Sequence, residues 1–596
     1  MSDAANPYAE YARRRERHKT TLASMERLDS RLSNARLAVF CVGLIVAYFA
    51  FWQELCAPAW TLAPVTGFVA LVIRQALLVR AMAATRANIV FYDRGIARIE
   101  DRWHGFGDNG ARYLDEHHPY AADLDLFGPD SMYQLLCTAQ TRTGKDMLAA
   151  WLTAPAESKT ILQRQEACAD LEQRLDLREN LAACAAEVSA GTSRLALPTW
   201  ASRPPVFASN APRWIGIALR TASVLAFLIG AYFNTLLPFA IAVVVEWSAM
   251  RATKRGIRAV LEGLEEPQRE LAVLLHALRL MEREPFSCET LKALQARFVV
   301  GGVPASAAID RLYRLTAWHD ARGNFLFAPF AALFLWDLNF AYAFERWRKT
   351  YGTHLPEWLD SLGELEALTS LACYGYEHPA DVFPVMSTEA PRFDGKALGH
   401  PIVPATRCVR NDVRLDGDMR LLLVSGSNMS GKSTLLRVVG INTVLALAGA
   451  KVRANSLTIS PLRIGATLRV QDSIQQGSSR FYAEISRVKL IVDLTKGPIP
   501  VLFLLDEVFS GTNSHDRRHG AEAVIRSLLD AGAIGLVTTH DLALAHIAET
   551  LGGRARNVHF EDQIANGQLA FDYVMRDGIV QKSNAIELMR AVGLDV

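Results

Sequence analysis

The C-terminal part of this chain is organised around nine residues, Gly426-Ser427-Asn428-Met429-Ser430-Gly431-Lys432-Ser433-Thr434. They follow an apolar run, Leu421 to Val424, and precede a helix-like segment. A strand, a glycine-rich loop and a helix in this order form a phosphate-binding loop, in which backbone N–H groups surround the phosphates. We expect Lys432 to reach the β- and γ-phosphate oxygens and Ser433 to offer its hydroxyl to Mg²⁺. The sequence therefore predicts a nucleoside triphosphate site that includes all nine residues.

Two further apolar runs end in residues suited to the same site. Val501 to Leu505 ends in Asp506 and Glu507, and a buried strand ending in two carboxylates is the usual second half of a phosphate-binding loop. We expect Asp506 to hold Mg²⁺, directly or through water, and Glu507 to polarise the attacking water. The run Ala533 to Val537 leads to His540, which at a strand's end can touch the γ-phosphate. Taken alone, His540 would be an ordinary strand-end residue.

Together these elements resemble the ATPase domain of MutS proteins. The resemblance also rests on Gly511 to Ser514 after the two carboxylates and on the segment Asp472 to Glu484. It implies ATP and Mg²⁺ as cofactors and a homodimer formed through the ATPase domains. In that family a Ser-x-Phe-x-x-Glu element supplies a serine to the partner's γ-phosphate, which makes Ser479 the candidate trans contact. The alternative is that Ser479 and Phe481 only cap and pack a helix.

The likeness extends to both sides of these motifs. Asn411-Asp412-Val413 precedes the loop at the family's spacing, so we count Asn411 among the nucleotide-binding residues. Asn557 to Phe560 and Lys582 to Ala585 resemble later elements of the family. One departure is Cys408, which stands where the family often has an aromatic ring stacked on adenine. The selectivity for adenine is therefore left open.

Residues 125–390 resemble the helical core and levers of MutS proteins. This part of the likeness rests on Asp130 to Leu136, Thr141 to Lys145, Trp151 to Pro155 and Ile161 to Leu171. The first 120 residues contain no Phe-x-Glu wedge like that of the family's mismatch-reading domain, and the sequence ends at Val596. We accordingly expect no mismatch-reading domain, no long C-terminal dimerisation tail and no appended nuclease domain.

The N-terminal region predicts a hairpin of membrane-spanning helices. Its apolar segments, Leu37 to Trp52 and Leu55 to Ile73, are separated by Gln53-Glu54 and a turn at Pro58. As helices of about 16 and 19 residues they would reach roughly 24 and 30 Å. Arginines lie before and after the hairpin but not in its turn, which places both ends in the cytoplasm. A signal peptide cleaved near Ala57-Pro58-Ala59 is less favoured, because a long basic leader precedes it and a second apolar segment follows.

A further apolar region runs from Trp214 to Trp247. A single crossing here would put the first part of the helical core and the ATPase domain on opposite sides of the membrane, although these pack together in the family. The region must therefore cross twice or not at all. We favour a second short hairpin that turns near Asn234-Thr235, and the alternative is a buried pair of core helices.

The charge and cysteine content of the chain indicate which binding partners to expect. The formal net charge of +2 is too small to indicate a nucleic-acid-binding protein. Basic clusters at Arg13 to Lys19 and Arg251 to Arg258 lie beside apolar segments, where anionic lipid headgroups explain them at least as well as DNA phosphates. Eight cysteines show no Cys-x-x-Cys spacing, so neither a zinc site nor a disulfide framework is indicated.

The sequence thus predicts an α plus α/β multidomain protein. We expect a multi-pass protein of the inner (cytoplasmic) membrane, with its ATP-hydrolysing domain in the cytoplasm and its levers acting on an unknown protein partner at the membrane. The alternative is a DNA-binding MutS homologue of mismatch repair or branched-DNA processing; an ABC transporter is disfavoured because a Leu-Ser-Gly-Gly-Gln signature is absent. The expected parts are a basic amphipathic segment at 1–36, a transmembrane hairpin at 37–80, a linker at 81–124, a MutS-like core at 125–390 with a membrane hairpin at 214–247, and an ABC-type P-loop ATPase domain at 395–596.

Overall fold

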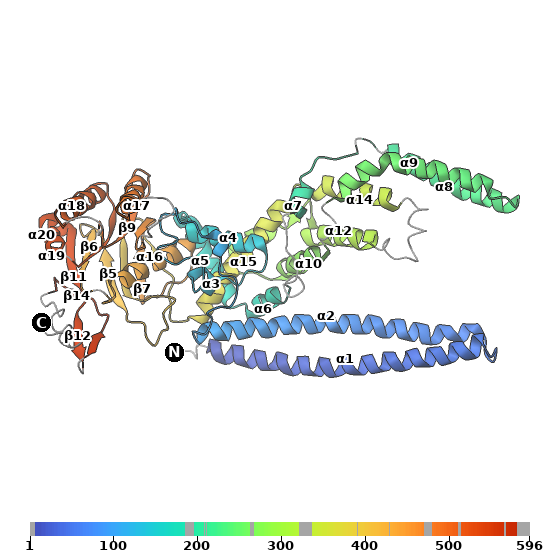
Figure 1. Cartoon of the computed structure of the whole chain (residues 1–596), viewed down its shortest axis with the longest axis horizontal. Coiled ribbons are helices and arrows are strands. Elements are labelled where there is room, and N and C mark those ends of the chain that lie inside the picture. Colours follow the sequence, from blue (N-terminus) through green and yellow to red (C-terminus); the bar gives the residue numbers. More distant parts are fainter. Residues whose placement is uncertain are drawn as a thin grey trace.

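The protein is elongated, with an α/β region at one end, a helical region in the middle and two helical hairpins that extend toward the other end (Figure 1). This computed structural model describes residues 6–184, 196–207, 209, 211–262, 268–320, 336–389, 391–427, 429–469, 480–509, 514–540, 542–565 and 568–580.

The first hairpin consists of α1 (Pro7–Phe51) and α2 (Leu62–Ile99), joined by a turn that contains the 3₁₀ helix η1 (Pro58–Thr61). Helix α1 begins where the Asn6 side chain accepts a hydrogen bond from the Tyr8 amide and Pro7 occupies the first turn. The boundaries that we drew at residues 36 and 81 do not coincide with breaks in either helix. Hydropathy changes at those points, but no proline or glycine interrupts the backbone there. Residues 81–99, expected in a linker, therefore continue α2.

A buried ion pair attaches the base of this hairpin to the helical region. Arg98 of α2 donates to both carboxylate oxygens of Glu377, at 2.6 and 2.5 Å, and the Tyr11 hydroxyl of α1 donates to the same carboxylate at 3.3 Å. Arg178 lies next to Tyr11 and stacks over the Tyr376 ring. Because Glu377 is fully desolvated, these charge-assisted contacts must hold the two helices in one position.

The helical region surrounds α15, which is buried over most of its length. Helices α4 and α5 pack on one side of it, and Glu366 of α15 accepts hydrogen bonds from the start of α4. The elements of this region are α3 (Met132–Leu136), α4 (Arg142–Thr153), α5 (Ser158–Glu172), α6 (Leu175–Cys184), α7 (Ala196–Ala201), α10 (Gln268–Arg283), α11 (Glu289–Ala296), β1 (Val299–Val300), β2 (Val303–Pro304), α12 (Ala305–Asp320), α14 (Trp336–Tyr351) and α15 (Leu355–Glu377).

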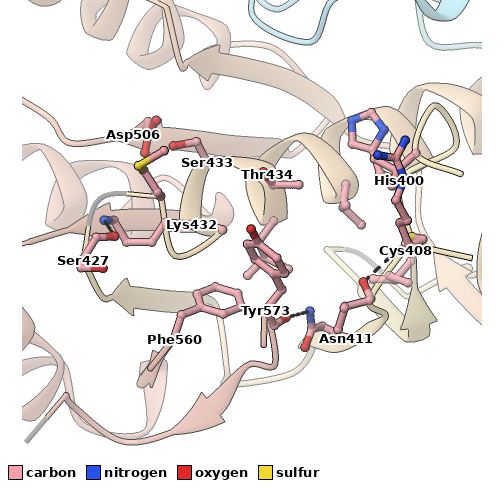
Figure 2. A pocket seen from close by; sticks show the side chains of 18 of the residues that line it. His400, Cys408, Asn411, Ser427, Lys432, Ser433, Thr434, Asp506, Phe560 and Tyr573 are labelled. Carbon is pink, nitrogen blue, oxygen red and sulfur yellow. Dashed lines mark hydrogen bonds between the residues drawn. The ribbon is translucent and has the colours of Figure 1, made fainter. Parts of the chain in front are cut away.

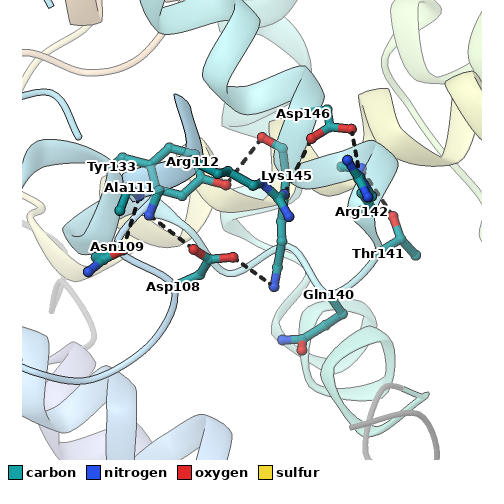
Figure 3. Close-up of polar contacts among 12 residues, drawn as sticks. Asp108, Asn109, Ala111, Arg112, Tyr133, Gln140, Thr141, Arg142, Lys145 and Asp146 are labelled. Carbon is teal, nitrogen blue, oxygen red and sulfur yellow. Dashed lines mark hydrogen bonds and ion pairs between the residues drawn. The ribbon is translucent and has the colours of Figure 1, made fainter. Parts of the chain in front are cut away.

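The chain that precedes the helical region is fixed to α4 by charged contacts (Figure 3). Lys145 pairs with Asp108 at 3.0 Å, and Arg112, in the short helix η2 (Ala111–Tyr113), pairs with Asp146 at 3.3 Å. The Tyr133 hydroxyl donates to the Lys145 carbonyl at 3.2 Å. Lys145 and Asp146 of α4 therefore hold the chain that precedes the helical region.

The second hairpin consists of α8 (Ala211–Tyr232) and α9 (Leu237–Leu261). Its turn includes Asn234 with a φ of +54°, a left-handed conformation that asparagine tolerates. Large apolar side chains face outward along both helices, so the alternative of a buried core pair does not describe this segment. These residues are Trp214, Ile215, Val224, Leu225, Phe227, Leu228, Ile229, Tyr232, Leu237, Ile241, Val243, Val244 and Val245.

By length and composition alone, three helices in the described part of the chain could cross a membrane. They contain Pro7–Phe51, Pro58–Ile99 and Arg213–Tyr232. Helix α9 packs along α8 as its partner in the second hairpin. Both hairpins extend from the helical region away from the α/β region (Figure 1).

The α/β region contains a six-stranded sheet with the order β14-β11-β6-β10-β9-β8, parallel except for β14. Leu422 and Val424 of β6 face a core that includes α16, whereas Leu421 and Leu423 face the core shared with α17 and α18. Burial on both faces explains why the central strands are continuous apolar runs. The strands are β6 (Leu421–Ser425), β8 (Arg463–Thr467), β9 (Val501–Asp506), β10 (Ile534–Thr539), β11 (Ala555–His559) and β14 (Arg576–Asp577).

A smaller four-stranded sheet, ordered β3-β7-β4-β5, and a β12–β13 hairpin complete this region. The strands are β3 (Val385–Met386), β4 (Phe393–Leu398), β5 (Asn411–Leu415), β7 (Ser456–Ile459), β12 (Asp562–Ala565) and β13 (Gln568–Phe571). The helices are α16 (Lys432–Ala448), α17 (Arg480–Leu494), α18 (Ser514–Asp530), α19 (Leu542–Ala545), α20 (Ile547–Leu551) and the 3₁₀ helix η6 (Gly552–Arg554).

Candidate nucleotide site

The predicted site residues meet at the carboxyl edge of the six-stranded sheet. Strand β10 lies between β6 and β9, with Thr539 paired to Ser425 and Thr538 paired to Asp506. The ends of three parallel strands therefore lie side by side, which is where ligands bind in open α/β sheets. A cavity of about 610 Å³ opens there, lined at one end by the phosphate-binding loop and at the other by residues near Cys408 (Figure 2).

The loop between β6 and α16 needs its glycines. Gly426 has a φ of +149° and Gly431 a φ of +106°, both in the region that side chains disfavour. A Cβ at Gly426 would lie only 2.8 Å from Ser430 Oγ. Ser430 Oγ in turn donates to the Ser427 carbonyl at 2.8 Å, closing the loop on itself. Met429, with a φ of +73°, is the one exposed large apolar residue of the loop.

Lys432 is buried at the base of this loop, with 4% of its side chain exposed. Its Nζ donates to the carbonyl oxygens of Gly426 at 2.8 Å and Ser427 at 2.7 Å, and lies 3.7 Å from Glu507 Oε1. Burial lowers the pKa of Lys432, while the Glu507 and Asp506 carboxylates oppose that shift. The ammonium group is thus held inside the cavity with nearby negative charge.

The two carboxylates at the end of β9 have different surroundings. Asp506 accepts a hydrogen bond from Thr538 Oγ1, and the same hydroxyl oxygen accepts from the Glu507 amide at 3.1 Å. Glu507, with a φ of +46° and 31% of its side chain exposed, lies 3.4 Å from His540 Nδ1. Glu507 therefore lies between Lys432 and His540, within reach of a group bound in the loop. Thr538, to which the sequence assigned no role, therefore fixes the Asp506 carboxylate and the backbone of Glu507.

The cavity wall between the loop and Cys408 contains aromatic and apolar groups. Tyr573, with a φ of +57° and 45% exposed, lies against the loop, because a Cβ at Gly431 would be 3.1 Å from Tyr573 Cδ1. Asn411 Nδ2 donates to the Tyr573 carbonyl at 3.0 Å, and Asn411 Oδ1 accepts from the Met575 amide at 2.8 Å. Asn411 thus lines the cavity and orients the chain that carries Tyr573. Cys408 and His400 lie farther along the same wall (Figure 2).

Tyr573 and Asp562 are, like Thr538, residues of this site to which the sequence assigned no role. Tyr573 supplies an aromatic ring that Cys408 cannot, and Asp562 accepts a hydrogen bond from Ser427 Oγ at 2.6 Å. Both follow the last parallel strand, and neither belongs to a short motif. Only the pairing of β11 with β6 brings this part of the chain to the loop.

The residues present suit a nucleoside triphosphate with Mg²⁺. The cavity is large enough for a small ligand, and it combines a buried lysine, loop amides, two carboxylates and the hydroxyl of Ser433. In the described residues no group of three His, Cys, Asp or Glu side chains could hold a metal alone. Mg²⁺ is usually bound by one or two protein groups together with phosphates and water, and Ser433 and Asp506 both line the cavity.

Some predicted residues lie outside the described part of the chain, namely Asn428, Ser479 and Lys582 to Ala585. Nearby, α17 begins at Arg480, and the Phe481 ring packs against Phe509 at 6.2 Å between centroids. Gly511 to Asn513 also fall outside it.

Comparison with known proteins agrees with this geometry. Residues 422–595 match the family model described as MutS domain V. The C-terminal part of this chain belongs to the MutS family. The matched MutS domain V residues include the loop, Asp506, Glu507, His540 and Tyr573, whereas Asn411 and Cys408 precede them. This part of the chain is therefore an ATPase-type domain of the MutS family.

Curated MutS relatives are similar over about the same part. A DNA mismatch repair protein MutS 2 of Halobacterium salinarum is 34% identical over 238 residues, covering 39% of this chain and 27% of the relative. A DNA mismatch repair protein MutS of Shouchella clausii is 31% identical over 261 residues, with 41% and 28% covered. An Endonuclease MutS2 of Thermus thermophilus is 29% identical over 262 residues, with 42% and 32% covered. The chain thus spans about a third or less of the length of these relatives.

Proposed function

We propose that this protein is a membrane-anchored MutS-like ATPase, in which ATP binding and hydrolysis at sites shared between two subunits move the helical region against a partner at the membrane. The observation that carries the proposal is the position of the two apolar hairpins, which extend from the helical region toward the end of the molecule opposite the ATPase-type domain (Figure 1). Neither hairpin is needed to build the nucleotide site.

At the site, this chain's residues have complementary tasks. Lys432 and the loop amides hold phosphate oxygens, Ser433 and Asp506 hold Mg²⁺, and Glu507 orients and polarises the attacking water. Mg²⁺ would neutralise charge on the phosphates. His540 lies beside Glu507 and can contact the terminal phosphate. Tyr573 offers its ring to the base, a role for which Cys408 is unsuited.

The dimer is part of the proposal. Each nucleotide would lie between the loop of one subunit and Ser479 of the other. Met429 of the loop and Tyr482 and Ile485 of α17 expose apolar surface, which a second copy of the domain would cover. ATP binding would then favour the closed dimer, and hydrolysis would release it.

The proposed membrane anchoring rests on the exposure of apolar side chains and on the topology of the two hairpins. Leu37, Leu44 and Ile45 on α1 and Leu77 on α2 face outward, where water would make their exposure costly. Each hairpin returns to the side from which it came, which keeps the helical region and the ATPase-type domain on one side. Basic residues follow each hairpin, as expected at a cytoplasmic membrane surface.

Native cysteines provide a direct test of membrane insertion. Cys41 is exposed on the apolar part of α1, Cys56 lies at the turn, and Cys408 lies in the nucleotide cavity. We expect a membrane-impermeant maleimide to label Cys56 in intact cells, to reach Cys408 only after lysis, and to label Cys41 only after the protein is solubilised and unfolded. Equal labelling of Cys41 and Cys408 in a soluble lysate fraction would rule out the anchor. Mass spectrometry of the individual cysteine peptides gives the readout.

The similarity to proteins named for DNA mismatch repair favours a second candidate, a DNA-binding protein of mismatch or branched-DNA processing. The test is binding of the detergent-purified protein to homoduplex, mismatched and four-way-junction DNA across a salt series, with Glu507→Gln to retain ATP. Selective, ATP-dependent binding would support this candidate. A weak background that salt removes would leave the membrane-side partner as the target, since phosphate contacts alone give a steep salt dependence.

A further inference from the structure

We infer that Asp123 is a positioning residue of the ATPase site, because its buried carboxylate fixes both ends of the segment that carries Ser479. This inference rests on the proposed composite site, in which Ser479 acts on the partner's nucleotide. Asp123 belongs to the chain that leads into the helical region, far in sequence from every motif of the ATPase-type domain.

The contacts of Asp123 define this role. Its side chain is 1% exposed, and Oδ1 accepts hydrogen bonds from the amides of Leu468 at 2.7 Å and Arg469 at 2.9 Å. Its other oxygen, Oδ2, pairs with Arg487 of α17. The chain leaves the described residues after Arg469 and returns at Arg480, the first residue of α17. One carboxylate thus holds the chain on both sides of residues 470–479.

Arg487 is held from several directions at once. It donates to the carbonyl oxygens of His118 at 3.0 Å, Glu116 at 3.3 Å and Ala466 at 3.5 Å. Arg487 lies two helical turns after Arg480, so its position sets that of the start of α17. The Arg487 guanidinium also donates to neutral carbonyl oxygens. Loss of the Asp123 charge would therefore loosen α17 without leaving the guanidinium unpaired.

The same segment also contacts the helix that follows the phosphate-binding loop. Arg437 of α16 donates to the Asp123 carbonyl at 3.3 Å, and a Cβ at Gly440 would lie 2.6 Å from Leu124. The Ala466 amide donates to the Pro119 carbonyl at 2.9 Å. The segment from Pro119 to Leu124 is therefore wedged between α16, β8 and α17, and a movement of this segment would change how α17 sits relative to the loop.

The expected phenotype separates positioning from binding. Asp123→Asn keeps the shape of the side chain but removes its charge. We expect the ATPase kcat to fall at least about tenfold, since small misplacements of a reacting group cost this much or more. The affinity of the subunit's own loop for ATP should stay within about twofold, because none of its phosphate-binding groups contacts the Asp123 carboxylate. Asp125→Asn is the matched control: that carboxylate is partly exposed and pairs with Arg469 and Arg437, so its loss should change kcat little.

Complementation between variants provides the decisive test. Asp123→Asn and Lys432→Ala chains are co-expressed with different tags and purified as mixed dimers. In such a dimer the intact loop of the Asp123→Asn chain faces the intact Ser479 segment of the Lys432→Ala chain, so one of the two sites is complete. We expect about half of the wild-type activity per mixed dimer, although either variant alone is nearly inactive. A residue that acted only within its own subunit would give no recovery.

Two further variants, tested in the same way, distinguish failure of the composite site from failure of the role of Asp123. Mixed dimers of Ser479→Ala with Lys432→Ala test the composite site itself, and their failure to recover would overturn both the shared site and this inference. Recovery with Ser479→Ala but not with Asp123→Asn would overturn the role of Asp123 alone. Arg487→Gln removes the other partner of the Asp123–Arg487 ion pair and should behave like Asp123→Asn. ATP binding and thermal unfolding show whether Asp123→Asn folds; if it does not, Arg487→Gln takes its place in the experiment.

Discussion

The Lys432 ammonium group lies 3.7 Å from the Glu507 carboxylate while it donates to two carbonyl oxygens of its own loop. The lysine is therefore pre-positioned by the loop rather than locked in a tight ion pair. Phosphate oxygens can replace the carbonyl partners without displacing the charge. The same arrangement leaves Glu507 free to act on a water molecule. Replacement of Lys432 and replacement of Glu507 should therefore impair different steps, ATP binding and ATP hydrolysis respectively.

Replacement of Glu507 by glutamine should preserve ATP binding and slow hydrolysis by roughly 10²- to 10⁴-fold, because only the group that polarises water is lost. Lys432→Ala, the matched variant, should abolish detectable binding, since it removes the buried positive charge of the cavity. Filter binding of labelled ATP and phosphate release measure the two effects separately. Hydrolysis by Glu507→Gln at the wild-type rate would contradict the assignment.

Loss of the Tyr573 ring should weaken nucleotide binding. If the ring stacks on the base, Tyr573→Ala should cost about 1–3 kcal/mol of binding free energy. Tyr573→Phe keeps the ring and should bind ATP within about twofold of the wild type. Fluorescence titration with a nucleotide analogue labelled on the ribose measures both. Unchanged affinity of Tyr573→Ala would place the base elsewhere in the cavity.

Nucleotide should protect Cys408 from alkylation. Cys408 is half-buried in the wall of the cavity, whereas Cys137 lies outside it and serves as an internal reference. With saturating ATP and Glu507→Gln, we expect maleimide modification of Cys408 to slow at least about tenfold while that of Cys137 is unchanged. Mass spectrometry after timed quenching follows each thiol. Equal rates with and without nucleotide would exclude the Cys408 wall from the binding site.

Acid should destabilise the folded state through His400. Burial, and then the charges of Arg437 and Arg453, lower its pKa in the folded protein to about 4, whereas an unfolded histidine titrates near 6.5. Between these values the unfolded chain binds more protons, so the free energy of unfolding rises with pH and levels off above about 6.5. Lowering the pH from 7 to 5 should cost about 2 kcal/mol from this residue.

The matched variant is His400→Asn, which keeps an acceptor for the Ile402 amide, now bonded to His400 Nδ1 at 3.3 Å. Between pH 8 and 5, the thermal unfolding midpoint of the wild type should fall further than that of His400→Asn, so the pH-dependent difference between the two proteins develops on the acid side. Parallel curves would show that His400 does not contribute to the pH dependence.

The parts of the site that the sequence could predict are local ones. The order of strand, loop and helix around Lys432 can be found in one short stretch, and the carboxylates Asp506 and Glu507 follow directly from an apolar run. Tyr573, Asp562 and Thr538 could not be predicted in this way, because the pairing of parallel strands brings them to the loop.

The same distinction applies to the fold. Hydropathy identified both apolar hairpins, since the composition of a helix that faces lipid differs sharply from that of a helix that faces water. It placed breaks at residues 36 and 81, where the backbone continues as helix, because hydropathy records the surroundings of a helix and not its ends. The attachment of the first hairpin through Glu377 had no signal in the sequence, since its partners lie far apart along the chain.

The attachment through Glu377 also sets an order of events during synthesis. Tyr11 and Arg98 precede Glu377 by 366 and 279 residues, so the first hairpin emerges from the ribosome long before its docking site exists. At roughly 5–20 residues per second, the interval between the synthesis of α2 and that of Glu377 is on the order of tens of seconds. The hairpin must therefore form as an independent unit before Glu377 is synthesised, and its attachment to the rest of the protein is a late step of biogenesis.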